Sequence, residues 1–162
     1  MAEEDQAARE TDQPKPQIKT QKVYLKDVSF ETPNSPQVFG QDWKPELTID
    51  FGSAAQAVSE DIYEVILTLT VTAKVEDKAA YLAEVHQAGI FLIRGLEQEK
   101  LQHALNVPCL RLIYPYACAA IADLVSKGGF PQLALSPISF QNIYRQRLQQ
   151  AQEDQQPVTE ED

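Results

Sequence analysis

Two long stretches of the chain alternate between apolar and polar side chains, and they give the clearest structural signal. Across residues 61–75, the odd positions from Val65 onward are apolar, whereas the even positions from Glu64 onward are mostly polar. Residues 79–94 repeat this period of two, so both stretches are predicted to be β-strands. The short acidic turn between them predicts an antiparallel hairpin. One polar face and one apolar face predict a sheet that is covered on one side only.

Two shorter strands are predicted before this hairpin, over Lys22–Phe30 and Glu46–Phe51. Simple alternation places Tyr24, Val28 and Phe30 on one face of the first strand. The opposite face then carries Asp27, Ser29 and Glu31. Three prolines and a glycine predict a loop between the two strands. The small residues 52–60 predict a connection to the hairpin.

The second half of the chain has the longer apolar period of helices. We predict a short helix over 97–106, a second over 109–127, and a third that follows Ser139 as its N-cap. A loop is predicted over 131–139. Strands followed by helices predict an α+β fold, in which the helices pack on one face of a four-stranded antiparallel sheet.

The second predicted helix has two unusual features. Pro115 lies inside it and predicts a break or a kink, and Gly128 with Gly129 predicts its end. Its sequence is apolar almost all round, which predicts burial on more than one side. Self-association would supply the second cover. A central position within a single copy of the chain would do so equally well.

Length and composition fit one folded domain with two tails. Residues 1–17 and 152–162 are polar, acidic and nearly free of large apolar side chains, so both are predicted to be disordered. The folded domain is then predicted to span residues 18–151. A single domain is the usual outcome for a chain of 162 residues.

The charge balance narrows the possible partners. The formal net charge of −10 argues against nucleic acid and anionic membranes, because both need clustered Lys and Arg. No run of roughly 18 apolar residues is present, so no segment is predicted to insert in a membrane. The polar, acidic N-terminus lacks the features of a secretory signal, which predicts a cytoplasmic location. The charge suits a basic protein partner, and it suits plain solubility equally well.

Few side chains are suited to catalysis or to metal binding. His86 and His103 have no neighbours at metal-ligand spacing, and no CxxC motif occurs, so no metal site is predicted. We expect His86 to be a solvated histidine on the polar strand face. Cys109 and Cys118 have apolar neighbours and are predicted to be buried, reduced thiols. Cys109 and His103 lack a third orienting group, so we predict no catalytic residue and no enzyme.

Several large aromatic side chains stand in predicted loops and near the proline of the second helix. They are Phe39, Trp43, Tyr114, Tyr116 and Phe130. Such residues could line a binding groove, or they could form a satellite of the core. The strand half of the chain is also rich in Asp and Glu, which form either a docking surface or an ordinary solvated face.

Several separated blocks of the sequence, in the same order, closely resemble the SecB family of protein-export chaperones. The blocks are residues 24–47, 61–73, 80–91 and 115–144. The likeness extends over nearly all of the predicted folded domain. It implies a homotetramer, built as a dimer of dimers, with helices between the dimers and sheets outside.

The resemblance also implies a function. SecB-like proteins are holdases that work without ATP, bind unfolded precursors of secreted proteins and deliver them to SecA, the motor ATPase of the secretion channel. It implies no cofactor, prosthetic group or metal for the chaperone itself. Unfolded chains expose apolar segments, so a holdase needs apolar and aromatic surface with little demand for exact shape.

Three sets of residues receive roles from the resemblance. The SecA contact falls on Asp27, Glu31, Leu82 and Glu84. The client groove would use Phe39, Trp43, Tyr114, Tyr116 and Phe130. Tetramer assembly would be influenced by Ala83, Val85 and Gln87. Strand alternation independently places the first set on polar faces.

The chain departs from the family pattern at two places. Family members often have a cysteine where Ala83 stands, and QQGG where residues 86–89 read HQAG. We expect neither difference to touch the proposed contacts.

Three alternatives stay open at this stage. The chain could be a SecB-like chaperone with another delivery partner, an interaction scaffold without clients, or an enzyme that uses Cys109. The acidic positions Asp27, Glu31 and Glu84 favour delivery to SecA.

Overall fold

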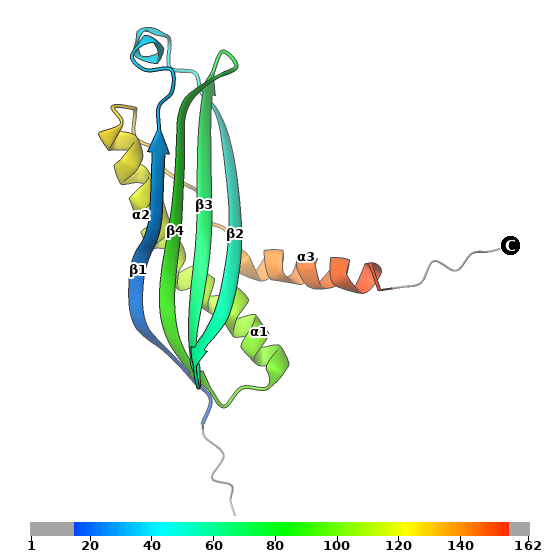
Figure 1. Cartoon of the computed structure of the whole chain (residues 1–162). Helices are drawn as coiled ribbons and strands as arrows, with labels where there is room; N and C mark the ends of the chain where they lie inside the picture. The colour runs from blue at the N-terminus through cyan, green and yellow to red at the C-terminus, as the bar shows by residue number, and fades with distance from the viewer. Residues whose placement is uncertain (1–14, 156–162) are drawn as a thin grey trace, which may run out of the picture.

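The structure is a computed structural model that describes residues 15–155, and it contains a four-stranded antiparallel sheet with three α-helices (Figure 1). The strands are β1 (Gln17–Glu31), β2 (Glu46–Ser59), β3 (Ile62–Val75) and β4 (Lys78–Arg94). The helices are α1 (Gln98–Asn106), α2 (Pro108–Lys127) and α3 (Phe140–Glu153), with a short 3-10 helix, η1 (Gln37–Gly40), after β1. The predicted α+β class and the four-stranded sheet are confirmed.

The strands lie in the order β1-β4-β3-β2, and every neighbouring pair is antiparallel. The odd positions of β3 from Val65 to Val75 are buried, while Thr68 and its even-numbered neighbours are half-buried or exposed. The predicted alternation of β3 and β4 is therefore confirmed. We call the face that carries Val65 the inner face and the face that carries Thr68 the outer face.

Helix α2 covers the inner face, where it packs on β3 and β4 (Figure 1). The core lies between them and includes Leu67, Leu69, Ile113 and Ile121, none of which is exposed. Each such side chain contributes about 1.5–3 kcal/mol by its removal from water. In the described part of the chain no helix lies over the outer face (Figure 1). Helix α3 extends away from the sheet.

Helices α1 and α2 follow each other with only Val107 between them. Together they form one segment, Gln98–Lys127, which is long and apolar enough to cross a membrane by length and composition, with 33% of its most apolar window buried. The buried part of this segment packs on β3 and β4, so its apolar side chains belong to the core. The helix of a protein core passes the same test of length and composition as a membrane span.

Helix α2 ends as predicted but does not break. Gly129 has a φ of +85°, and the amide of Phe130 donates to the carbonyl of Val125 at 3.3 Å, which closes the helix end. The helix continues through Pro115, so of the predicted break or kink the break is wrong. Proline deprives the carbonyl of Arg111 of its amide partner. Both residues are exposed, and water can satisfy that carbonyl.

The predicted connection over residues 52–60 is also wrong, because β2 continues to Ser59. Small residues have low strand propensity, but β3 offers a partner to nearly every one of them, from Gly52 opposite Thr68 to Ser59 opposite Ile62. Tertiary pairing therefore overrides local propensity here.

The predicted faces of the first strand are confirmed for Val28 and Phe30 but not for Tyr24. Val28 and Phe30 pair with inner-face residues of β4. A register shift between Leu25 and Asp27 adds one residue to β1, which turns Tyr24 to the outer face. The prediction that Tyr24 shares a face with Phe30 is wrong for this reason.

The predicted tails lie largely outside the described residues. β1 begins at Gln17 and α3 ends at Glu153, so the ordered elements reach one or two residues into each predicted tail. The division into tails and domain stays a prediction.

Candidate docking face and client groove

The outer face brings together the four residues that were predicted to contact SecA. Glu31 of β1 is the ladder partner of Leu82 on β4, and Ser29 is the partner of Glu84. Asp27 follows on the same face, opposite His86. Pairing of β1 with β4 therefore places Asp27, Glu31, Leu82 and Glu84 on one patch, which we call the acidic patch.

Glu84 is held in place within the acidic patch. Its Oε1 accepts a hydrogen bond from Thr70 Oγ1 at 2.8 Å, and its Oε2 lies 3.4 Å from His86 Nε2. The Thr70 hydroxyl, and then His86, lower the pKa of the Glu84 carboxyl below its ordinary value of 4.5. Its side chain remains 43% exposed. Glu84 is thus a fixed negative charge that a partner can reach.

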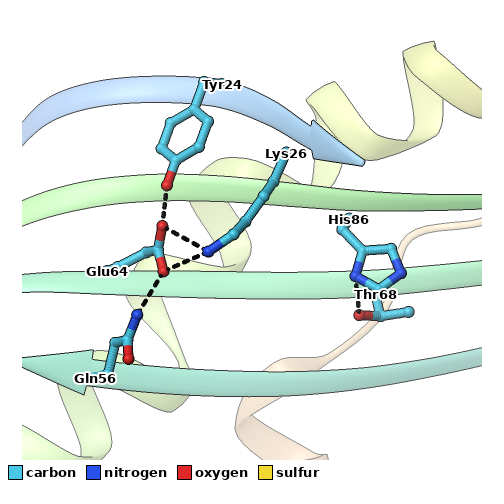
Figure 2. A network of polar contacts seen from close by, with 6 residues as sticks. All are labelled: Tyr24, Lys26, Gln56, Glu64, Thr68 and His86. Atoms are coloured by element: carbon cyan, nitrogen blue, oxygen red, sulfur yellow. Dashed lines mark hydrogen bonds and ion pairs between the residues drawn. The ribbon is translucent and has the colours of Figure 1, made fainter. Parts of the chain in front are cut away.

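His86 belongs to this patch, which the sequence did not reveal. It stands on the outer face as expected, but it contacts Glu84 and faces Asp27 across the ladder, and its Nδ1 lies 3.4 Å from Thr68 Oγ1 (Figure 2). His86 is partly solvated as expected, and it also contacts Glu84 of the proposed docking face. Only strand pairing shows the neighbours that it acquires.

A polar network crosses the outer face beside the acidic patch (Figure 2). Glu64 on β3 accepts hydrogen bonds from the Tyr24 hydroxyl, from Lys26 Nζ at 2.9 Å and from Gln56 Nε2 at 2.9 Å. The Tyr24 ladder partner, Ala88, is fully buried although it belongs to the outer face. The network therefore joins β1, β3 and β2 over a covered patch.

The network perturbs both of its acidic groups. The hydrogen bond to Glu64 is the main reason that the pKa of Tyr24 rises to about 12. The Tyr24 and Lys26 donors hold the pKa of Glu64 below its ordinary value, although burial opposes them. Glu64 is only 7% exposed, so its charge is enclosed by these donors. The partners of Glu64 are distant in sequence, and strand alternation alone could not identify them.

The inner face holds the three residues that the resemblance connects with assembly. Ala83 and Val85 are fully buried, and Gln87 is 4% exposed. Gln87 Nε2 donates to the Tyr24 carbonyl at 2.9 Å, which satisfies a buried amide. All three lie on the helix-covered inner face of the sheet.

Three of the five predicted groove aromatics form a cluster. The rings of Phe39 and Trp43 lie 5.1 and 5.4 Å from the ring of Phe130, and Tyr81 lies 4.9 Å from it. Phe130 is buried, Trp43 is half-buried, and Phe39 is 51% exposed. The cluster therefore combines a core anchor with one open aromatic face.

The remaining two aromatics lie apart from this cluster. Tyr114 donates to the Ser136 carbonyl at 2.7 Å, and its ring meets Phe140 edge-on at 5.6 Å. Tyr116 is 54% exposed on α2 and makes none of the cluster's aromatic contacts. Residues 114 and 116 are separated by about 200° around a helix, so they cannot share one side.

The edge strand β2 adds apolar surface that sequence reasoning did not assign. Leu47 and Ile49 lie on the inner face, yet they are 40% and 43% exposed. The covering helix packs on β3 and β4, which leaves this edge of the inner face open. Their alternation was visible in the sequence, but their exposure depends on how far α2 reaches.

Cys109 is a buried free thiol as predicted, whereas Cys118 is half-buried, so the prediction that both are buried is wrong for Cys118. Burial raises the pKa of the Cys109 thiol to about 12, which disfavours the thiolate. His103 Nε2 instead contacts Gln141 Oε1 at 2.8 Å, between α1 and α3. Within residues 15–155, no three His, Cys, Asp or Glu side chains come close enough to hold a metal ion.

Comparisons with known proteins agree on one family. The family model of SecB, described as preprotein translocase subunit SecB, matches residues 11–151. This chain belongs to the SecB family. It is 47% identical over 152 residues to the protein-export protein SecB of Methylococcus capsulatus, which covers 94% of this chain and 98% of that protein.

Two other relatives and a solved structure extend the comparison. The protein-export protein SecB of Marinobacter nauticus is 46% identical, and the match covers 95% of this chain and 93% of that protein. The protein-export protein SecB of Nitrosococcus oceani is 49% identical, and the match covers 84% of this chain and 84% of that protein. A SecB-like chaperone of Mycobacterium tuberculosis, solved with an antitoxin peptide, superposes with a TM-score of 0.64 at 16% identity, over 75% of this chain and 90% of that chain. This structure supports the fold.

Proposed function

We propose that this chain is an ATP-independent holdase that binds unfolded precursors of secreted proteins, keeps them competent for translocation and delivers them to SecA. The observation that carries the proposal is membership of the SecB family over residues 11–151, with relatives that are named as protein-export proteins. A holdase needs no cofactor and no catalytic residue, and we place it in the cytoplasm, where precursors are made.

The client groove is proposed around the open aromatic cluster. Phe39 offers an exposed ring, Trp43 and Phe130 support it, and Leu47 and Ile49 extend apolar surface along β2. Exposed apolar surface of this kind suits segments that an unfolded chain exposes. Tyr114 and Tyr116 stay proposed as outlying contacts along α2.

The acidic patch is proposed as the docking face for SecA. Asp27, Glu31 and Glu84 present negative charge on an uncovered sheet face, and Leu82 adds an apolar contact among them. Such a surface suits a basic segment of the partner, because complementary charge accelerates encounter and fixes orientation. The two proposed sites have different chemistry, so a client and SecA could be bound by one chaperone at once.

The assembly is proposed to be a homotetramer formed as a dimer of dimers. Leu112 and Tyr116 lie one helical turn apart on α2 and are 40% and 54% exposed, on a helix whose other side is buried. A second copy would cover this apolar stripe. Tyr116 would then meet clients at the boundary between two copies.

Titration calorimetry with two ligands tests the function. The ligands are a reduced, unfolded secretory precursor and a synthetic C-terminal tail of SecA. We expect the wild-type chain to bind both. Asp27→Lys should weaken tail binding by about tenfold or more and leave precursor binding unchanged, because it reverses one charge of the acidic patch.

The matched variant Phe39→Ala should show the opposite pattern, with weaker precursor binding and normal tail binding. Normal tail affinity in Asp27→Lys would overturn the docking face. Precursor binding without tail binding in the wild type would mean a holdase with another delivery partner. Failure to bind either ligand would overturn the holdase proposal.

A further inference from the structure

The acidic patch lies against one histidine, His86, and histidine is the residue type whose charge can change near neutral pH. His86 stands on β4 between the acidic ladder partner Asp27 on β1 and Glu84 on its own strand. Its side chain is 34% exposed, so protons exchange freely with solvent. Histidine is the ordinary side chain whose charge changes between about pH 5 and 8.

His86 has polar and charged neighbours on β1, β3 and its own strand, β4. On β1 these are Asp27 and Lys26, and Lys26 Nζ is already engaged by Glu64 at 2.9 Å. On β3 they are the uncharged Thr68 and Thr70. On β4 the charged neighbour is Glu84, whose Oε2 lies 3.4 Å from His86 Nε2. The charges closest to His86 are therefore carboxylates of the acidic patch.

The geometry accepts both charge states of His86 without a rearrangement. Nε2 faces Glu84 Oε2 at 3.4 Å and Nδ1 faces Thr68 Oγ1 at 3.4 Å. When Nδ1 is deprotonated, the Thr68 hydroxyl can donate to it; when Nδ1 carries a proton, the same hydroxyl can accept. Glu84 accepts from Nε2 in both states. The patch can thus change charge while its shape is preserved.

We propose that His86 is a proton-controlled member of the docking face, which lowers the affinity for a basic partner segment when it is protonated. Protonated His86 adds a positive charge to the acidic patch, 3.4 Å from Glu84, and partly neutralises the carboxylates that would attract a partner's cation. Neutral His86 keeps its contact with Glu84 but leaves the negative charge of Asp27, Glu31 and Glu84 uncompensated. Glu84 itself stays ionised through this range, since Thr70 and His86 lower its pKa.

The sign of the effect follows from linkage. The partner binds better to the deprotonated form, so its affinity should rise with pH across the range of about pH 5 to 8 in which a histidine loses its charge. By reciprocity, binding of the partner must displace protons from His86. In high-dielectric water, one unit charge about 4 Å from the partner's cation changes its affinity by about three- to tenfold. The inference rests on the proposed docking face, because it concerns the same patch.

The test uses calorimetry with a lysine-rich peptide that is acetylated, amidated and free of His and Cys, so that its own charge is constant. Affinities are measured at about pH 8 and about pH 6. We expect wild-type affinity to fall about three- to tenfold at the lower pH. His86→Gln should bind equally at both values, at the wild-type level of the higher pH. Near the lower value, measurements in two buffers of different ionisation enthalpy should reveal proton release by the wild type and none by His86→Gln.

Two control variants separate the possible failures. His103→Gln, which changes the other histidine of the chain on α1, should behave like the wild type at both pH values. Asp27→Lys should lose the peptide at both. If Asp27→Lys binds the peptide normally, the docking face is wrong. If Asp27→Lys loses the peptide but His86→Gln keeps the wild-type pH dependence and proton release, the role of His86 is wrong while the docking face stands.

Discussion

At the scale of single residues, the enclosed carboxylate of Glu64 makes a stability prediction. Glu64 accepts from Tyr24, Lys26 and Gln56. Its replacement by Gln would keep one acceptor oxygen, turn an NH2 donor toward these donors and remove the charge that pairs with Lys26. We expect Glu64→Gln to lower the free energy of unfolding by about 1–3 kcal/mol at neutral pH. Glu60→Gln, at an exposed carboxyl in the turn before β3, should change it little. Urea unfolding of both variants measures this difference.

The same residue gives the fold an acid dependence with a defined sign. The folded pKa of Glu64 is below its ordinary value of 4.5, so its stabilisation is complete above that value. The stabilisation is lost as pH falls through the lowered folded pKa. The gap in unfolding free energy between the wild type and Glu64→Gln should therefore narrow below pH 4.5. A gap that stays constant down to acid unfolding would contradict the assigned role of the network.

Residue-level predictions from the sequence succeed where alternation is unbroken and fail at the bulge in β1. The faces of Asp27, Glu31, Leu82 and Glu84 follow from a period of two. The face of Tyr24 does not follow from it, because the residue added between Leu25 and Asp27 moves Tyr24 to the opposite face. Contacts such as that between His86 and Glu84 depend on rotamers and on strand pairing, which no local pattern specifies.

At the scale of elements, the joint between the end of α2 and β1 is tightly packed. A Cβ at Gly128 would meet the Phe30 ring well inside van der Waals contact, and Gly128 has an ordinary helical φ of −72°. The glycine is thus required by space and not by backbone conformation. We expect Gly128→Ala to destabilise the fold by about 1–3 kcal/mol through overpacking.

Gly40 supplies the matched control for this joint. It ends η1, and a Cβ there would meet nothing within 4 Å. Gly40→Ala should therefore leave the free energy of unfolding within about 0.5 kcal/mol of the wild type. Urea unfolding measures both free energies of unfolding. If the two alanine substitutions change them equally, the Phe30 ring can move aside for the added methyl group without loss of stability.

Element boundaries were predictable only where local signals and tertiary pairing agree. The hairpin of β3 and β4 and the Ser139 cap of α3, which accepts from the Asn142 amide at 3.3 Å, were both foreseen. The length of β2 was not, since its small residues take strand form only opposite β3. Pro115 predicted a helix boundary that does not exist, because the exposed side of a packed helix tolerates a missing hydrogen bond.

At the scale of the whole molecule, the two sheet faces divide the work that the proposed function requires. The outer face is polar and uncovered, with the acidic patch at one part and the Glu64 network beside it. The inner side carries α2 and the apolar surfaces proposed for clients and for assembly. The sequence of α2 is apolar on nearly all sides, which predicted that a second surface covers this helix. In the single chain, Leu112 and Tyr116 of α2 are exposed.

That exposed stripe leads to a prediction about assembly. If a second copy covers α2, Leu112→Glu would place a charge within an apolar interface and should convert tetramers into smaller species. The single-chain fold should survive, because Leu112 is 40% exposed and lies away from the sheet-facing side of α2. Val58→Glu, which changes a 58% exposed residue on β2, should leave the mass unchanged. Mass photometry with circular dichroism measures both. A tetramer that tolerates Leu112→Glu would place the contact between dimers elsewhere, and the stripe on α2 would then be free surface for clients.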